Sequence, residues 1–122
     1  MTFLSRIFGK KSTTDQKSKD VVVFDDIQVT VTRRDGTQET LFWSDLEEVA
    51  IVTTDEGPLV DDMFFVLFGS SRECRVSKRA DGAMELLGRL QELPGFRNET
   101  ALQAMGSTEN ARFLCWSKGS AL

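Results

Sequence analysis

The sequence predicts a single α+β domain, built on an antiparallel sheet of five to six strands with one main helix and a second short helix near the C-terminus. Three observations support this prediction. Within the domain, β-branched and alternating apolar segments come first, the stripe of a longer helix appears only after residue 80, and 122 residues leave room for one domain. The composition, 40% hydrophobic and 28% charged, is ordinary for a globular protein.

The first 20 residues differ in charge and polarity from the rest of the chain. Five basic residues against two acidic ones give residues 1–20 a net charge of +3, while the whole chain carries −4, so residues 21–122 carry −7. Residues 10–20 contain no apolar side chain, which is typical of a flexible linker. We therefore expect a flexible basic leader over residues 1–20 and one folded domain over residues 21–122.

The first strands follow from β-branched and alternating residues. Residues 21–24 are a β-branched run, and apolar and polar residues alternate over 27–32. Asp35-Gly36 predicts a type I′ hairpin turn into a return strand over 37–43. Ser44-Asp45-Leu46-Glu47 has the form of a capping box, so one helical turn is expected before a strand over 49–53.

Residues 63–68 are apolar on both faces, which predicts a central strand. Shorter strands are expected over 74–77 and 111–116. The stripe of leucines over 83–93 predicts the main helix, with Asp81 as its cap and Pro94-Gly95 as its end. Asn98 is expected to cap the second helix, which ends at Gly106.

Two resemblances to known families follow from short motifs. Trp43-Ser44-Asp45-Leu46-x-x-Val49 resembles the step between strands in small bacterial pleckstrin-homology-like domains, over residues 27–53. A second set resembles segments that recur in an uncharacterised family of small bacterial proteins, over residues 40–116. It implies a bacterial origin and no particular activity. Its members are Asp55-Glu56-Gly57-Pro58, Asp62-Met63-Phe64-Phe65-Val66-Leu67, Leu93-Pro94-Gly95-Phe96 and Phe113-Leu114-Cys115-Trp116.

The chain contains no histidine, which limits the chemistry available to it. Histidine is the usual general base and the commonest metal ligand, and it completes most Ser and Cys nucleophile pairs. We therefore expect no enzyme activity, no catalytic residue, and no metal or other cofactor. A paired-carboxylate site with Glu56 and Asp62 is the remaining catalytic alternative.

Cysteine usage and the first residues indicate a cytoplasmic protein. Cys74 and Cys115 form no CxxC motif and are expected to be buried, reduced thiols, with a disulfide or a reactive thiol as the alternative. Phe3 to Phe8 is too short for the apolar core of a signal peptide. Trp43 and Trp116 are expected to anchor the core.

An acidic stretch is the main candidate for a binding site. Residues 45–62 hold no Lys or Arg, so their carboxylates can meet a basic protein partner, ligate Ca²⁺, or form a solvated rim. Their spacing does not match an EF-hand loop. The predicted partner-binding residues are Glu47, Glu48, Asp55, Glu56, Asp61 and Asp62, with Asp45 beside them.

Two basic segments offer other contacts. Arg72, Arg75, Lys78 and Arg79 either bind phosphate or guard an edge strand against pairing with another chain. The apolar residues of the leader lie at helical spacing beside basic ones and could touch an anionic membrane. They are Phe3, Leu4, Ile7 and Phe8. Nucleic acid is not an expected partner, because the acidic domain repels the phosphate backbone.

The function expected from these features is that of a non-catalytic binding protein of bacterial type. Its most specific form is an immunity-type inhibitor that neutralises a cognate toxin through an acidic surface, because a toxin that acts on nucleic acid presents a basic surface. The alternative is a membrane-proximal, pleckstrin-homology-like adaptor that uses the leader. An enzyme that works with carboxylates alone is the second alternative.

Overall fold

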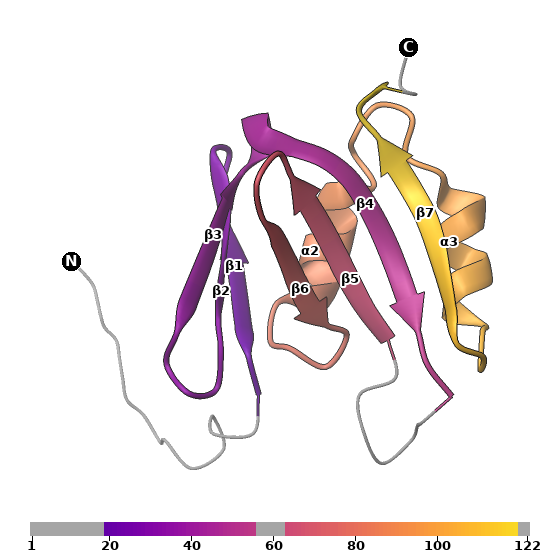
Figure 1. The fold of residues 1–122 in the computed structure, drawn as a ribbon, viewed down its shortest axis with the longest axis horizontal. Helices are drawn as coiled ribbons and strands as arrows, with labels where there is room; N and C mark the ends of the chain where they lie inside the picture. Colours follow the sequence, from indigo (N-terminus) through magenta and orange to yellow (C-terminus); the bar gives the residue numbers. More distant parts are fainter. Residues whose placement is uncertain (1–18, 56–62, 120–122) are drawn as a thin grey trace.

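The computed structural model describes residues 19–55 and 63–119, and its fold is mixed α+β (Figure 1). Seven strands form two antiparallel sheets in this part of the chain, in the orders β1-β2-β3 and β6-β5-β4-β7. The elements are β1 (Val21–Phe24), β2 (Gln28–Thr32), β3 (Gln38–Phe42), the 3-10 turn η1 (Trp43–Asp45), β4 (Leu46–Thr53), β5 (Met63–Gly69), β6 (Glu73–Ser77), α2 (Ala83–Leu90), α3 (Asn98–Met105) and β7 (Ala111–Ser117).

The connection from β3 to β4 explains why there are two sheets in place of one sheet of five to six strands. The chain passes through η1 without folding back, so β4 pairs with β5 and β7 and not with β3. The predicted helical turn is therefore present, but no side-chain cap bond holds it and the capping box does not form. Leu46 begins β4 directly after η1, three residues earlier than expected.

The β2–β3 hairpin forms where Asp35-Gly36 predicted it, with a different turn. The Gly36 N–H donates to the Arg33 carbonyl at 2.9 Å, and the Arg33 N–H donates to the Thr37 carbonyl at 2.8 Å. Three residues thus form the loop, with Gly36 at φ 93° in the left-handed region. The Thr37 N–H also donates to Asp35 Oδ1 at 2.9 Å, and this bond stabilises the three-residue loop in place of a two-residue type I′ turn.

Helix α2 begins after a glycine and not after an aspartate cap. Gly82 precedes it at φ 89°, and no side chain caps the helix. Asp81 instead binds β1 through its backbone: its carbonyl accepts from the Val22 N–H at 2.8 Å. The predicted cap at Asp81 is therefore wrong, because this residue is part of a contact between strand and helix.

The two helices end and begin close to the predicted positions, with local differences. Residues 91–93 continue α2 as turns with i+3 to i bonds, such as Leu93 N–H to the Leu90 carbonyl at 3.0 Å. For α3 the N-cap is Arg97. Asn98 does not cap the helix; its Oδ1 accepts from Gln91 Nε2 at 3.1 Å and so joins the two helices.

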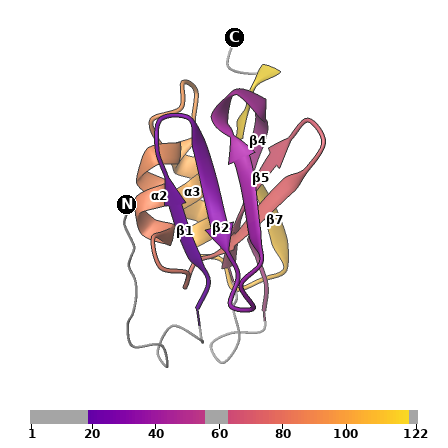
Figure 2. The same cartoon turned by 90° about the vertical axis from the view of Figure 1, so that its left-hand side faces the viewer.

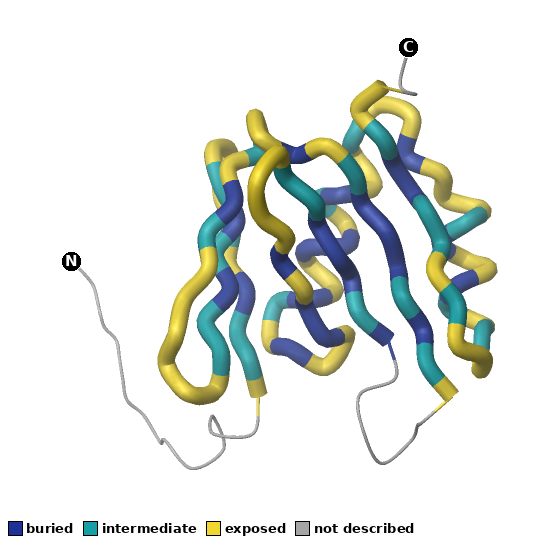
Figure 3. The backbone as a smooth tube through the Cα atoms, in the orientation of Figure 1, coloured by how far each residue is buried: buried dark blue, intermediate teal, exposed yellow. Residues whose placement is uncertain are grey.

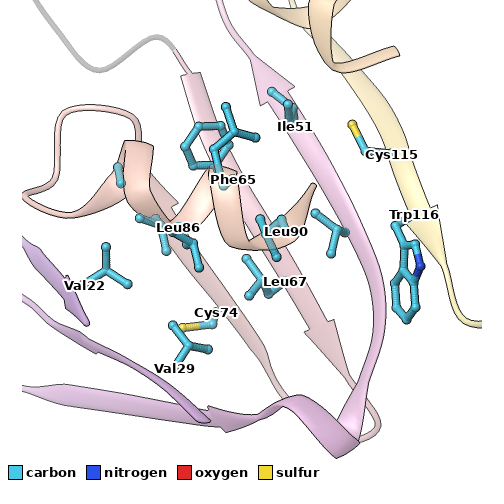
Figure 4. Close-up of a cluster of buried hydrophobic side chains, with 14 of the residues drawn as sticks. Val22, Val29, Ile51, Phe65, Leu67, Cys74, Leu86, Leu90, Cys115 and Trp116 are labelled. Atoms are coloured by element: carbon cyan, nitrogen blue, oxygen red, sulfur yellow. The ribbon is translucent and has the colours of Figure 1, made fainter. Parts of the chain in front are cut away.

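The core lies between the inner faces of the two sheets and the helices (Figures 3 and 4). Strand β5 pairs with β4 and β6, so its predicted central place is confirmed. From it, Phe65 and Leu67 face Leu86 and Leu90 of α2 in the close-up. The largest fully buried side chains are Phe65, Leu41, Leu46, Ile51, Leu67, Leu86, Leu90, Val29, Val31, Val49, Val66 and Val76.

Side chains join the two sheets where β3 and β6 meet, since no backbone ladder connects these strands. Arg33 Nη1 donates to the Arg75 carbonyl of β6 at 2.7 Å. The same nitrogen lies 3.2 Å from Asp20 Oδ2, and Arg33 Nη2 lies 2.6 Å from Glu39 Oε1 of β3. Arg72 Nη1 donates to the Thr40 carbonyl of β3 at 3.1 Å. Two arginines therefore fasten the sheets together.

Two residues that the sequence assigns to the leader contact the folded domain. Asp20 binds Arg33 and also accepts from the Arg34 N–H at 3.0 Å, and Lys19 Nζ lies 3.5 Å from Asp81 Oδ1. Across the described residues, neither helix has the length and apolar character needed to cross a membrane.

Candidate interaction surfaces

The structure divides the predicted acidic site between the two ends of β4. Asp45 and Glu47 lie exposed at the start of the strand, whereas Asp55 lies exposed beyond its end. Eight residues at about 3.3 Å each place these ends roughly 25 Å apart. The described carboxylates thus form two separate acidic ends and not one patch. Glu56, Asp61 and Asp62 lie outside the described residues.

The carboxylates at these ends differ in how far they are neutralised. Glu48 Oε1 lies 3.4 Å from Arg112 Nη2 on β7. Within residues 19–55 and 63–119, no ion pair engages Asp45, Glu47 or Asp55. Glu47 sits at a bulge between β4 and β5, which leaves its side chain exposed. In the same part of the chain, no group of three or more carboxylates or thiols is arranged to hold a metal ion.

The arginines of the basic segment serve the fold in ways the sequence did not reveal. Arg72 joins the sheets, as described above. Arg75 places its guanidinium carbon 5.0 Å from the centroid of the Phe64 ring, a cation–π contact between neighbouring strands. Lys78 and Arg79 are exposed at the turn that follows β6. The described structure therefore does not bring these four residues together as a phosphate site.

The two thiols are free and buried, as predicted. Burial raises the pKa of Cys74 to about 11. Burial likewise raises the pKa of Cys115 above its usual value. A thiol kept protonated at neutral pH is a poor nucleophile, so neither cysteine is a catalytic candidate.

Both tryptophans pack as anchors with their indole N–H groups bonded. Trp116 is buried and donates to the Pro94 carbonyl at 2.7 Å. Trp43 is half-buried, donates to the Asp25 carbonyl at 2.7 Å, and lies edge-on to Phe24 with the Arg89 guanidinium carbon 4.6 Å from its ring centroid.

A second surface, which sequence analysis missed, is the uncovered side of the four-stranded sheet. Both described helices lie behind this sheet in Figure 1, and the opposite side faces the viewer. We call this side of the sheet the open face. The strand register places a set of apolar residues on it. Its members are Ala50, Val52, Phe64, Val66, Phe68 and Leu114. The signal was the two-sided apolar pattern of residues 63–68, interpreted above only as a mark of a central strand.

Two members of the open face are buried without joining the core cluster. Ala50 and Val66 are 0% and 2% exposed, yet neither belongs to the core cluster. Part of their cover comes from two arginines that fold inward. Arg112 of β7 reaches across β4 to place its guanidinium carbon 5.3 Å from the Phe68 ring centroid on β5, and Arg75 covers Phe64. The open face is thus apolar beneath two movable side chains.

The outer face of the three-stranded sheet, turned toward the viewer in Figure 2, carries no charged residue in its paired rows. Val23 and Phe42 are its exposed apolar residues, at 59% and 46%. A hollow of about 110 Å³ lies there, lined by Val23, Phe24, Asp25, Gln28 and Thr30. Sites for drug-sized molecules start near 300 Å³, so this hollow is too small for a ligand of that size.

No family model matches this chain, and comparisons with curated proteins and with solved structures also give no match. The predicted membrane-contact residues Phe3, Leu4, Ile7 and Phe8 lie outside the described residues.

Proposed function

We propose that this chain is a non-catalytic binding protein whose partner is a basic protein. The observation that carries the proposal is the charge of the domain: residues 21–122 bear −7, and Asp45, Glu47 and Asp55 remain exposed without an ion pair in the described structure. Such charges attract a basic surface and speed its association. The most specific form of the proposal is an immunity-type inhibitor of a bacterial toxin.

The separation of the acidic ends sharpens what the partner must look like. Because roughly 25 Å of β4 lies between Asp45 and Asp55, a basic surface must extend over about that length to reach both. A partner contacts the end after β4, where Glu56, Asp61 and Asp62 follow in sequence, or spans both ends. Charge reversal at each end separately distinguishes these arrangements.

The test is capture of partners from a native lysate by the full-length protein at low and moderate salt. We expect replacement of Asp55, Glu56, Asp61 and Asp62 by Lys to abolish capture of a basic protein, and replacement of Asp45 and Glu47 to weaken it only if the partner spans both ends. Glu85→Lys with Glu99→Lys is the matched control, since both residues are exposed on α2 and α3 and lie outside the acidic stretch of residues 45–62. An unchanged set of captured proteins would exclude the acidic interface, provided circular dichroism shows each variant folded.

The alternative function is a membrane-proximal adaptor with a pleckstrin-homology-like fold. Two antiparallel sheets with α2 behind them support it as a fold, and its membrane contact would come from Phe3, Leu4, Ile7 and Phe8. Flotation with vesicles that contain anionic lipid tests it. Loss of flotation on replacing these four residues by Ser would favour the adaptor, and no flotation of the original chain would exclude it.

A further inference from the structure

We infer that the open face of the four-stranded sheet is the surface through which two copies of this chain associate. This inference goes beyond the proposed function, because it concerns a different surface and a different partner. It starts from the apolar side chains that the described helices leave uncovered: Val52, Phe64, Phe68 and Leu114 are only half-buried, although they belong to the most apolar strands of the molecule. They lie side by side on one face of the sheet, where partly exposed apolar side chains can contact a partner.

The charges on this face identify the occupant. Register places Glu48 and Glu73 on it together with Arg75 and Arg112, so the face is electrically balanced within a domain of −7. A basic protein would meet two guanidinium groups at its centre. A second copy brings equal numbers of both signs, and this is a surface where two acidic domains can meet with little repulsion.

The ion pair on the face suits a two-fold arrangement. In such an interface a contact between residue i and residue j of the partner occurs twice. Arg112 and Glu48 lie 3.4 Å apart within one chain, and each can exchange its partner for the equivalent residue of the second copy. The guanidinium groups that cover Phe68 and Phe64 then move aside or stack between the two sheets, which pack about 10 Å apart.

The size of the face sets the strength expected of this dimer. Four strands about 4.8 Å apart and about six residues long span on the order of 400 Å² of planar sheet. Stable interfaces bury about 800 Å² of accessible surface per partner. The planar area of the open face is about half of that value, so association should be weak and reversible, with a dissociation constant in the micromolar to sub-millimolar range.

Sedimentation equilibrium of the unmodified full-length protein, from about 5 μM to about 500 μM, is the first test. We expect the mean mass to rise from monomer toward dimer over this range. A monomer at every concentration would overturn the inference without any variant. Val52→Lys and Leu114→Lys place charge on the face, and each should raise the dissociation constant at least about tenfold.

Two matched variants locate the interface. Leu102→Lys, on the solvent side of α3 at 72% exposure, should leave the dimer unchanged. Val23→Lys, on the outer face of the three-stranded sheet, should also leave the dimer unchanged. A dimer lost with Val23→Lys and kept with Val52→Lys would overturn the inference and move the interface to that sheet.

The paired exchange Glu48→Arg with Arg112→Glu should restore a dimer that either single change weakens, and a failure to restore it would contradict the role of this pair. Val52→Lys and Leu114→Lys leave every predicted partner-binding carboxylate in place, so capture of a basic protein by these two variants tests the proposed function separately.

Discussion

At the residue scale, glycine and arginine carry structural roles that residue type alone did not reveal. Gly82 replaces the expected aspartate cap, because its backbone adopts φ 89° and lies against β1. A Cβ at this position would stand 2.2 Å from the Val22 carbonyl oxygen. Neither the conformation nor the space admits any other residue, so the start of α2 depends on this glycine.

Gly82→Ala should therefore destabilise the domain by roughly 2–4 kcal/mol, the sum of a left-handed conformation and a backbone clash. Gly88→Ala in the same helix is the control. A Cβ there meets nothing within 4 Å, and alanine should stabilise the helix by about 0.5–1 kcal/mol. Urea unfolding of both variants measures the difference, and equal effects would contradict the role given to Gly82.

At the element scale, the start of the domain lies two residues before the first strand. Asp20 accepts bonds from the Arg33 guanidinium and the Arg34 N–H, and its carbonyl accepts from the Asp81 N–H at 2.9 Å. The sequence assigned Asp20 to the linker because its neighbours are polar. Its role depends on residues 13 and more positions away, which composition does not report.

Two truncations separate the leader from the domain. Removal of residues 1–18 should leave the melting temperature within about 2 °C, because the stretch offers little apolar surface to dock. Removal of residues 1–20 should cost about 1–2 kcal/mol through the lost Asp20 bonds, a fall of roughly 4–16 °C for a domain of this size. Differential scanning calorimetry gives both values. A fall with the shorter truncation would show that the leader packs on the domain.

At the scale of the whole molecule, the two sheets depend on side chains for their junction. Arg33 is the main link, since one guanidinium contacts β6, β3 and the residue before β1. A planar group with several donors can make these bonds together, which a lysine ammonium cannot reproduce. The junction therefore rests on the identity of this side chain and not only on its charge.

Arg33→Ala should lower the free energy of unfolding by about 2–3 kcal/mol, because it leaves Asp20 and Glu39 without their partner. Arg33→Lys should recover less than half of that loss. The neighbouring Arg34, which is exposed, is the control, and Arg34→Ala should change stability by less than about 0.5 kcal/mol. Chemical denaturation measures the free energy of unfolding of the three variants. Similar losses for Arg33→Ala and Arg34→Ala would refute the role of Arg33 in joining the two sheets.

The spacing of apolar residues and the turn-forming residues in the sequence predicted most of the helices and strands. Alternation located β2, the leucine stripe located α2, and the apolar run of residues 63–68 located the central strand, since these signals act between neighbours in the chain. The sequence also excluded histidine chemistry and located buried thiols at Cys74 and Cys115. The cap at Asp81 failed because the backbone of this residue bonds to β1, and the cap at Asn98 failed because its side chain bonds to Gln91 at the end of α2.

Only the tertiary structure decided how these elements divide into two sheets and which surfaces they leave open. The acidic residues 45–55 are close in sequence, but an extended strand carries its ends roughly 25 Å apart. Conversely, Arg112 and Phe68 are 44 positions apart and meet across β4. The sequence of a strand with two apolar faces shows that both faces avoid water. Only the placement of α2 and α3 decides which of the two faces the helices cover. The open face exists because both described helices pack on the same side.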